Sequence, residues 1–169
     1  DLKNFGYITE ELGRFKATCS KLFIDTEEKA KKLGFEKGHY FILNAPLLLG
    51  LKEEHYKFLK AEIKNRVKFL LKENKIKVKE NILFVGIGNP QITADSFGDA
   101  VIQKLDISPF ERDNHVYKIS PNTFSNTGIN AYEITRLLVE GFNISAVVLF
   151  DALATTSLNR LGTSIQFND

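Results

Sequence analysis

The spacing of apolar and polar residues predicts a strand, a helix, a strand and a long helix in the first half of the chain. Residues 14–24 approach an alternation of apolar and polar positions, and residues 39–46 form a short apolar run. Between them, residues 25–34 carry the signature of a capped helix, with acidic residues first, lysines later and a closing glycine. Residues 52–73 repeat apolar side chains at helical spacing. That long helix should bury Tyr56, Leu59, Ile63, Val67 and Leu70 or Leu71.

From residue 81 the pattern changes to strands that alternate with helices. The runs NILFVGIG (81–88) and SAVVLFD (145–151) are almost continuously apolar, as in parallel strands covered on both faces. Helices at about 95–105 and 128–140 separate them from shorter strands at 115–119 and 164–168. Such alternation predicts a parallel sheet with right-handed crossovers.

The predicted fold class is therefore α/β, a three-layer sandwich with a mostly parallel sheet plus a small N-terminal α+β lobe. Residues 1–80 should form that lobe and a linking helix, and residues 81–169 the α/β core.

Composition and charge fit a soluble protein of the cytosol. The net charge is +2, but residues 1–80 carry +6 and residues 81–169 carry −4. The basic excess has two explanations: a surface for an acidic partner, or the solvated face of the long helix. No nucleic-acid motif accompanies it, so we expect no direct binding of nucleic acid. The longest apolar run is too short to cross a membrane, and Cys19, the one cysteine, should be a buried apolar residue.

Two aspartates stand where an α/β fold places its site. Asp95 follows the first parallel strand and Asp151 ends another, and sites in open α/β sheets form beyond the carboxyl ends of strands. Two carboxylates held close together can share a proton and act as acid and base on a peptide bond. They could instead bind a divalent metal. In a third interpretation, Asp95 caps a helix, Asp99 lies in its first turn and Asp151 caps a turn.

Other motifs are incomplete. Gly86 and Gly88 begin a dinucleotide fingerprint, but Gln91 stands where its third glycine belongs. There is no G-x-S-x-G serine elbow. His39 and His55 lie in the predicted lobe, so only His115 accompanies the aspartates, where a metal role stays open.

Three motifs and an upstream stretch together resemble the germination protease family of spore-forming bacteria. VGIGNPQITADSFGDAVIQKL is similar to its glycine turn, T-x-D-x-x-G and helix, and PNTFSNTGINAYEI to its Pro-to-Thr-Gly-Ile segment. FDALATTSLNRLGTSIQFND resembles its D-A-L-A-x-x-S-x-x-R stretch and T-x-I-Q strand, and EEKAKKLGFEKGHYFILN its upstream helix, turn and strand. The resemblance covers roughly residues 13–169.

The resemblance implies an atypical aspartic endopeptidase that degrades small acid-soluble spore proteins inside the spore or forespore. It implies a zymogen and a homo-oligomer, without cofactor or metal. Asp95 and Asp151 match the family's essential aspartates. The residues expected to shape the site are Gly86, Gly88, Asn89, Thr127, Gly128, Ser157 and Arg160.

The sequence also departs from the family pattern. Ala94 and Asp99 replace usual prolines and Phe97 replaces a leucine, and Asp99 adds a carboxylate near Asp95. The family continues beyond the position of Asp169 into a His-Pro-Gly-Ser-Gly segment. We therefore expect a fragment or a shortened relative, and the alternative function is a non-catalytic relative that binds proteins. The fold is also similar to that of hydrogenase-maturation endopeptidases, a metal-assisted alternative in which Asp95, Asp151 and His115 would cooperate.

Overall fold

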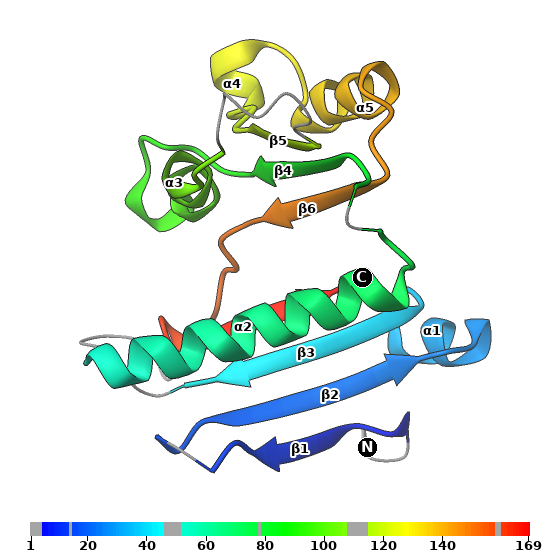
Figure 1. The fold of residues 1–169 in the computed structure, drawn as a ribbon, viewed down its shortest axis with the longest axis vertical. Helices are drawn as coiled ribbons and strands as arrows, with labels where there is room; N and C mark the ends of the chain where they lie inside the picture. The colour runs from blue at the N-terminus through cyan, green and yellow to red at the C-terminus, as the bar shows by residue number, and fades with distance from the viewer. Residues whose placement is uncertain (1–4, 14, 46–51, 78, 108–114, 158–159) are drawn as a thin grey trace. The chain divides into compact units, whose positions relative to one another are not determined.

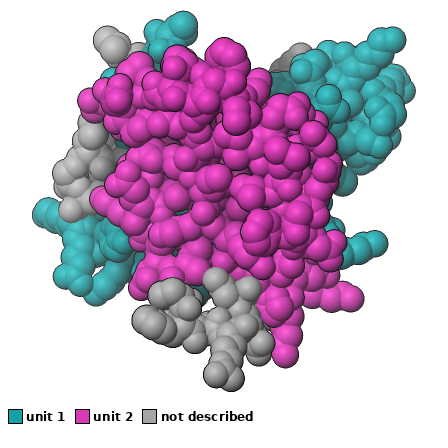
Figure 2. Space-filling view, turned by 90° about the horizontal axis from the view of Figure 1, so that it is seen from above, with its two compact units in different colours: residues 1–75, 155–169 teal, residues 76–154 magenta. Residues whose placement is uncertain are grey.

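A computed structural model describes residues 5–13, 15–45, 52–77, 79–107, 115–157 and 160–169. The chain divides into two compact units: unit 1 comprises residues 1–75 and 155–169, and unit 2 comprises residues 76–154 (Figures 1 and 2). Arg14 and Pro46, at the ends of two predicted strands, lie outside the described residues.

Unit 1 is built on a four-stranded antiparallel sheet with the order β1-β2-β3-β7. Its strands are β1 (Ile8–Glu11), β2 (Thr18–Ile24), β3 (Gly38–Asn44) and β7 (Ser164–Asn168). Its helices are α1 (Glu27–Leu33) and α2 (Glu53–Glu73). The α+β lobe predicted at the N-terminus is therefore present, with β7 added from the end of the chain.

Local sequence explains α1 and the start of β2. Thr26 caps α1 by accepting a 3.3 Å hydrogen bond from the Lys29 backbone N–H, and Gly34 ends it at φ 70°. The predicted helix is thus confirmed. The strand predicted from residue 14 begins at Thr18 instead, because Phe15 and Lys16 have φ of 57° and 53°, which extended backbone excludes. Strand β1 was not expected, since its four residues are too few for a clear alternation.

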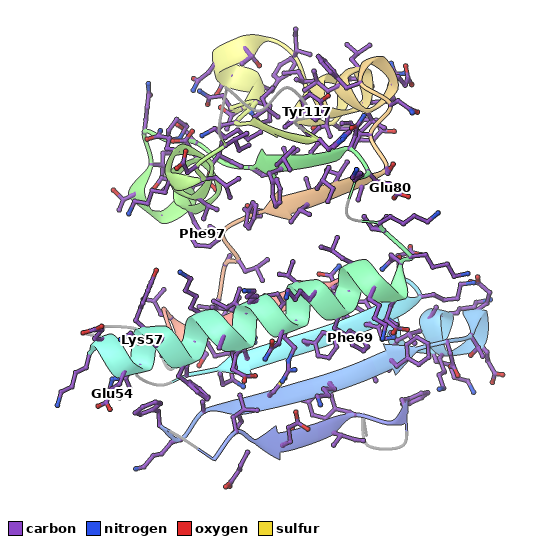
Figure 3. The ribbon with its side chains drawn as sticks, in the orientation of Figure 1. Glu54, Lys57, Phe69, Glu80, Phe97 and Tyr117 are labelled. Carbon is purple, nitrogen blue, oxygen red and sulfur yellow. The ribbon has the colours of Figure 1, made fainter. Side chains whose placement is uncertain are left out.

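One hydrophobic cluster of unit 1 lies between α2 and the sheet, and another joins Leu22 and Ile24 of β2 to Ala30 of α1. Cys19 and Leu43, paired across β2 and β3, are both 0% exposed, so the prediction of a buried cysteine is confirmed. Leu59 of α2 packs against Leu43, and Phe69 contacts the ring of Phe41 with centroids 5.5 Å apart (Figure 3).

The prediction that Tyr56 is buried by α2 is wrong, because it is 57% exposed. At that end of the helix, Phe58 packs against the cluster of Leu43, Ala45 and Leu59 instead. The ring of Phe15 lies 4.0 Å from that of His55 and 5.5 Å from that of Phe58.

Unit 2 contains the predicted parallel sheet. Its order is β5-β4-β6, with β4 (Ile82–Gly86) between β5 (Val116–Ile119) and β6 (Ala146–Phe150). The described parts of the connections contain the α-helices α3 (Phe97–Lys104), α4 (Phe124–Thr127) and α5 (Ala131–Gly141). Strands that alternate with helices in sequence have thus formed a parallel sheet, as predicted.

The two apolar strands of unit 2 differ in burial. Leu83 and Val85 of the central strand β4 are 2% and 0% exposed, whereas Val147 and Leu149 of the edge strand β6 are 38% and 60% exposed. Leu83 and Val85 lie on one face of β4, and Ile82 and Phe84 on the other face are only partly buried. The expectation that both strands are covered on both faces therefore holds for one face of β4 and not for β6. At the other edge, the ring of Tyr117 in β5 lies 5.0 Å from that of Phe142 (Figure 3).

Strand β7 forms where it was predicted but in a different sheet. The sequence placed residues 164–168 in the α/β segment, whereas they pair antiparallel with β3, with Ile165 opposite Leu43. Both side chains belong to the same hydrophobic cluster. Pairing with β3 therefore gives Ile165 an apolar neighbour in unit 1. Among the described helices, none has a long enough apolar stretch to span a membrane.

Asp169 fastens the end of β7 to the rest of unit 1. Its carboxylate accepts hydrogen bonds of 2.5 Å from the His39 backbone N–H and 2.6 Å from the Asn74 side-chain amide, and it lies 3.3 Å from the His39 ring. Burial alone would raise the pKa of Asp169, but the bonds from the His39 backbone, Asn74 and the His39 ring together hold that pKa below its ordinary value.

We expect Asp169→Asn to lower the melting temperature of unit 1 near neutral pH. A carboxylate with a lowered folded-state pKa contributes stability above its unfolded pKa of about 3.9 and loses that contribution as the pH falls through the lowered value. The difference between wild type and variant should therefore shrink over that acidic range, as measured by thermal unfolding at several pH values. Glu36→Gln, at an exposed carboxylate of unit 1, serves as control. A difference that stays constant from neutral to acidic pH would contradict this account.

Candidate active site

Asp95 lies in the connection between β4 and α3, at the end of a single 3-10 turn, η2 (Thr93–Asp95). Its carboxylate Oδ2 accepts a 2.8 Å hydrogen bond from the Asn89 backbone N–H. Gly88 has φ 125°, and a Cβ at that position would overlap the carbonyl oxygen of Asp95. The turn after β4 thus requires glycine at position 88 to hold the half-buried Asp95 against it.

The interpretation of Asp95 as a helix cap is wrong. Ser96 occupies the N-cap position of α3 and makes no side-chain capping bond, while the Asp95 carboxylate bonds to the preceding turn. Asp99 does lie in the first turn of α3, as predicted, and its Oδ2 accepts a 2.6 Å hydrogen bond from the Gln103 side chain. The added carboxylate is therefore bonded along the helix.

Asp151 directly follows β6 and is exposed. One residue earlier, the carbonyl oxygen of Phe150 accepts a 2.8 Å hydrogen bond from the Ile87 backbone N–H, which joins the ends of β4 and β6. Across the described ranges, the carboxylate of Asp151 has no hydrogen-bond or ion-pair partner, and no bond supports its interpretation as a turn cap. It is therefore available to a substrate or to a second carboxyl group.

Helix α3 brings the two aspartates to one edge of the parallel sheet. It contacts both β4 and β6, and Figure 1 shows it beside the arrowheads of these strands. The contact is made by Gly98, three residues after Asp95, which touches the carbonyl of Phe150, one residue before Asp151. Both carboxylates thus lie beyond the carboxyl ends of neighbouring parallel strands, where α/β folds place their sites.

Thr127 and Gly128 shape the connection that follows β5. Gly128 ends α4 at φ 70° and donates its N–H to the Phe124 carbonyl at 2.8 Å. The Thr127 hydroxyl donates to the Ile129 carbonyl at 2.9 Å and accepts from the Ile129 N–H at 3.2 Å. Because this hydroxyl is engaged in its own turn, the expected role of both residues is conformational.

Ser157 and Arg160 belong to unit 1, whereas the aspartates belong to unit 2. The Arg160 backbone N–H donates a 3.0 Å hydrogen bond to the Ser157 carbonyl. Their role in shaping the site stays a prediction.

The structure does not bring His115 to the aspartates. His115 precedes β5, and its carbonyl accepts a 2.8 Å hydrogen bond from Ile82, the first residue of β4. Its ring lies 3.0 Å from the Asn81 side chain. It therefore sits at the amino ends of the strands, a strand's length of about 16 Å from the carboxyl ends. Nowhere in the described part of the chain do three His, Cys, Asp or Glu side chains gather in a geometry that could hold a metal ion.

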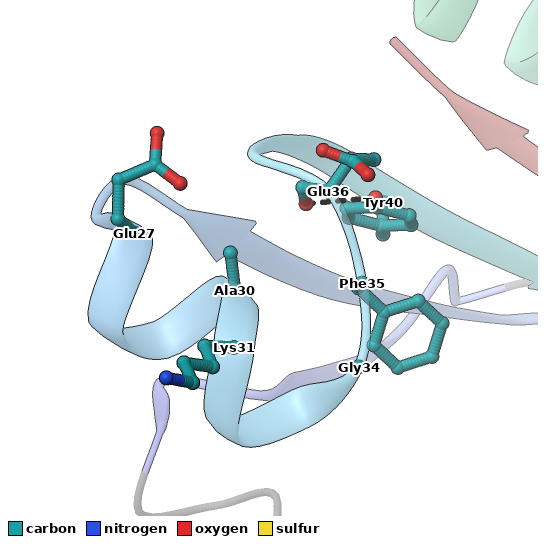
Figure 4. Close-up of a pocket in the computed structure, with 7 residues that line it drawn as sticks. All are labelled: Glu27, Ala30, Lys31, Gly34, Phe35, Glu36 and Tyr40. Carbon is teal, nitrogen blue, oxygen red and sulfur yellow. Dashed lines mark hydrogen bonds between the residues drawn. The ribbon is translucent and has the colours of Figure 1, made fainter.

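Unit 1 contains a pocket that includes neither aspartate. Figure 4 shows it between α1 and the start of β3, with Phe35 and Tyr40 beside Glu27, Lys31 and Glu36. Two of its polar side chains already have partners: Glu27 pairs with Lys37 at 2.8 Å, and the Tyr40 hydroxyl donates to the Glu36 carbonyl at 2.9 Å. We assign it no chemistry.

Sequence reasoning missed the importance of Gly98, which it treated only as part of a motif. A glycine in the first turn of a helix weakens the helix by roughly 1 kcal/mol relative to alanine, so its presence there is itself a signal of close backbone contact. The partner of that contact, the Phe150 carbonyl, depends on the fold and has no signal in the sequence.

Comparison with known proteins assigns the chain to a family. The germination protease family matches residues 5–169. A germination protease of Clostridium perfringens is 32% identical over 155 residues, which cover 85% of this chain and 46% of the relative. One from Geobacillus sp. (strain WCH70) is 29% identical over 162 residues, covering 85% and 41%, and one from Caldanaerobacter subterraneus is 27% identical over 164 residues, covering 91% and 49%. The chain thus spans at most about half the length of these curated relatives. Since the family match extends over residues 5–169, the chain belongs to the germination protease family.

Proposed function

We propose that this chain carries the aspartate pair of an endopeptidase that hydrolyses small acid-soluble spore proteins. The observation that carries the proposal is the position of Asp95 and Asp151. Both follow strands of one parallel sheet at its carboxyl edge, and α3 contacts the ends of both strands. Membership in the germination protease family supports the same reaction.

The chemistry follows from two carboxyl groups that share one proton. The ionised carboxylate accepts a proton from a water molecule as the water oxygen attacks the peptide carbonyl carbon, and the protonated carboxyl donates its proton to the carbonyl oxygen. A proton is then delivered to the nitrogen as the C–N bond breaks, which releases an amine and a carboxylic acid. No metal or cofactor is required in this scheme.

The two carboxylates differ in their contacts with the rest of unit 2. Asp95 is half-buried, and its carboxylate accepts a 2.8 Å hydrogen bond from the Asn89 backbone N–H. Asp151 is exposed and has no partner among the described residues. We therefore infer that the turn after β4 fixes the position of Asp95, whereas the exposed Asp151 side chain can meet a substrate directly.

The proposal includes the other properties that the sequence predicted. These are action inside the spore or forespore, maturation from a zymogen, assembly into a homo-oligomer and a three-layer arrangement around the parallel sheet. Gly86, Gly88 and Asn89 shape the Asp95 turn, while Thr127, Gly128, Ser157 and Arg160 shape the remaining connections. The metal-assisted alternative lacks a supporting observation, because His115 lies at the opposite ends of the strands.

A cleavage assay tests the proposal. Residues 1–169, and in parallel the complete open reading frame, are incubated with a purified small acid-soluble spore protein with and without a chelator, and products are identified by mass spectrometry. We expect discrete internal cuts that the chelator does not prevent. Loss of cleavage with the chelator would favour the metal-assisted alternative. Absence of cleavage in every preparation would favour a non-catalytic relative that binds proteins.

A further inference from the structure

Gly98 is the point at which three segments of unit 2 meet. It is buried, and a Cβ built on it would overlap the carbonyl oxygen of Phe150 as well as the backbone of Ile87. These two residues are themselves joined, since the Ile87 N–H donates to the Phe150 carbonyl at 2.8 Å. The start of α3 therefore rests directly on the hydrogen bond that links the ends of β4 and β6.

The helix is also constrained from a neighbouring position. A Cβ on Gly86, the last residue of β4, would overlap the carbonyl group of Gly98 and the side chain of Ile102. Ile102 is 5% exposed, so little free space remains beside it. The contacts of Gly98 with Ile87 and Phe150, and that of Gly86 with the Gly98 carbonyl, are made with backbone atoms, which cannot rotate away as a flexible side chain could.

We propose that Gly98 is a positioning residue for the aspartate pair, because its lack of a side chain sets how closely the start of α3 approaches the end of β6. Asp95 lies three residues before Gly98, and Asp151 lies one residue after its contact at Phe150. The effect on catalysis rests on the proposed function, in which Asp95 and Asp151 act as a pair. An added methyl group would move Asp95 and Asp151 apart without removing either carboxylate.

The variant Gly98→Ala tests this inference against Gly141→Ala. Gly141 is the last residue of α5, and a Cβ there would meet nothing within 4 Å, so the same substitution adds a methyl group in open space. We expect Gly98→Ala to lower kcat by about 100-fold, as a misplacement of about 1 Å does, with KM changed far less. Gly141→Ala should leave both unchanged.

The pH profile separates positioning from a loss of folded protein. A smaller folded fraction lowers the rate equally at every pH, whereas greater separation weakens the repulsion between the two carboxyl groups. The pH range in which the pair holds a single shared proton then narrows, so the bell-shaped profile of Gly98→Ala should be narrower than that of wild type. A profile of unchanged shape, or a kcat equal to wild type, would overturn the proposal.

A measurement without substrate keeps the inference distinct from the proposed function. Carboxyl-carbon NMR can follow the Asp95 signal as the pH is changed. We expect this signal to titrate at lower pH in Asp151→Asn than in wild type. The difference caused by Asp151→Asn should be smaller when Gly98→Ala is also present. If that difference is smaller while no preparation cleaves protein, the proposed function falls and the positioning role stands. If Gly98→Ala fails to fold, the comparison of wild type with Asp151→Asn remains. An Asp95 titration that is the same in both proteins overturns the proposal.

Discussion

Asp151→Asn is expected to lower the cleavage rate by about 1,000-fold, because asparagine can neither donate nor accept the transferred proton. The same loss is expected for Asp95→Asn, whose amide oxygen can still accept the hydrogen bond from Asn89. Since Asp151 is exposed and asparagine has nearly its shape, the free energy of unfolding should change by less than about 0.5 kcal/mol. Initial rates with a small acid-soluble spore protein, with thermal unfolding of the same samples, measure both effects.

Asp106→Asn is the matched control for this prediction. Asp106 is an exposed aspartate of the same unit, two residues after α3 ends at Lys104. The control should cleave at the wild-type rate. A near-normal rate in Asp95→Asn or Asp151→Asn would remove that residue from the chemistry, whereas an equal loss in Asp106→Asn would point to a general effect of charge.

Leu43→Ala is expected to have the largest effect on stability. Leu43 is 0% exposed at the centre of unit 1, in a cluster with Ala45, Leu59 and Ile165. Removing its branched end leaves a cavity between β3, β7 and α2, with a typical cost of about 3 kcal/mol. For a unit of this size such a loss corresponds to a fall of roughly 15 °C in melting temperature.

Leu161→Ala provides the comparison, since Leu161 lies in the same unit and is 61% exposed. Its melting temperature should stay close to that of wild type. Hydrogen exchange followed by mass spectrometry should show that Leu43→Ala increases exchange in β2, β3 and β7. An equal destabilisation by both substitutions would contradict the burial that distinguishes the two leucines.

Features determined by neighbours in the sequence were predicted well. Thr26 and Gly34 bound α1 as expected, because capping depends on a few adjacent residues. The apolar run of residues 81–88 contains a central parallel strand, β4. The placement of Asp95 and Asp151 at one edge also followed from sequence, since alternating strands and helices predict a parallel sheet and the ends of its strands.

The remaining features depend on contacts between distant segments. Residues 164–168 were expected in the α/β segment, yet a strand's pattern does not say which edge it will pair with, and β7 joins β3. Gly98 carries no local sign of its partner, because the Phe150 carbonyl reaches it only through the fold. The sequence grouped His115 with the two aspartates as possible metal ligands, but in the fold His115 lies at the opposite ends of the strands.

The rate of the double variant Asp95→Asn, Asp151→Asn, compared with both single variants and wild type, tests the central claim most directly. If the two carboxyl groups act as one pair, removing the second after the first costs little more, so the double variant should cleave about as slowly as either single variant. Losses that multiply, with the double variant slower by the product of the two single effects, would mean that the aspartates act independently and would contradict the account.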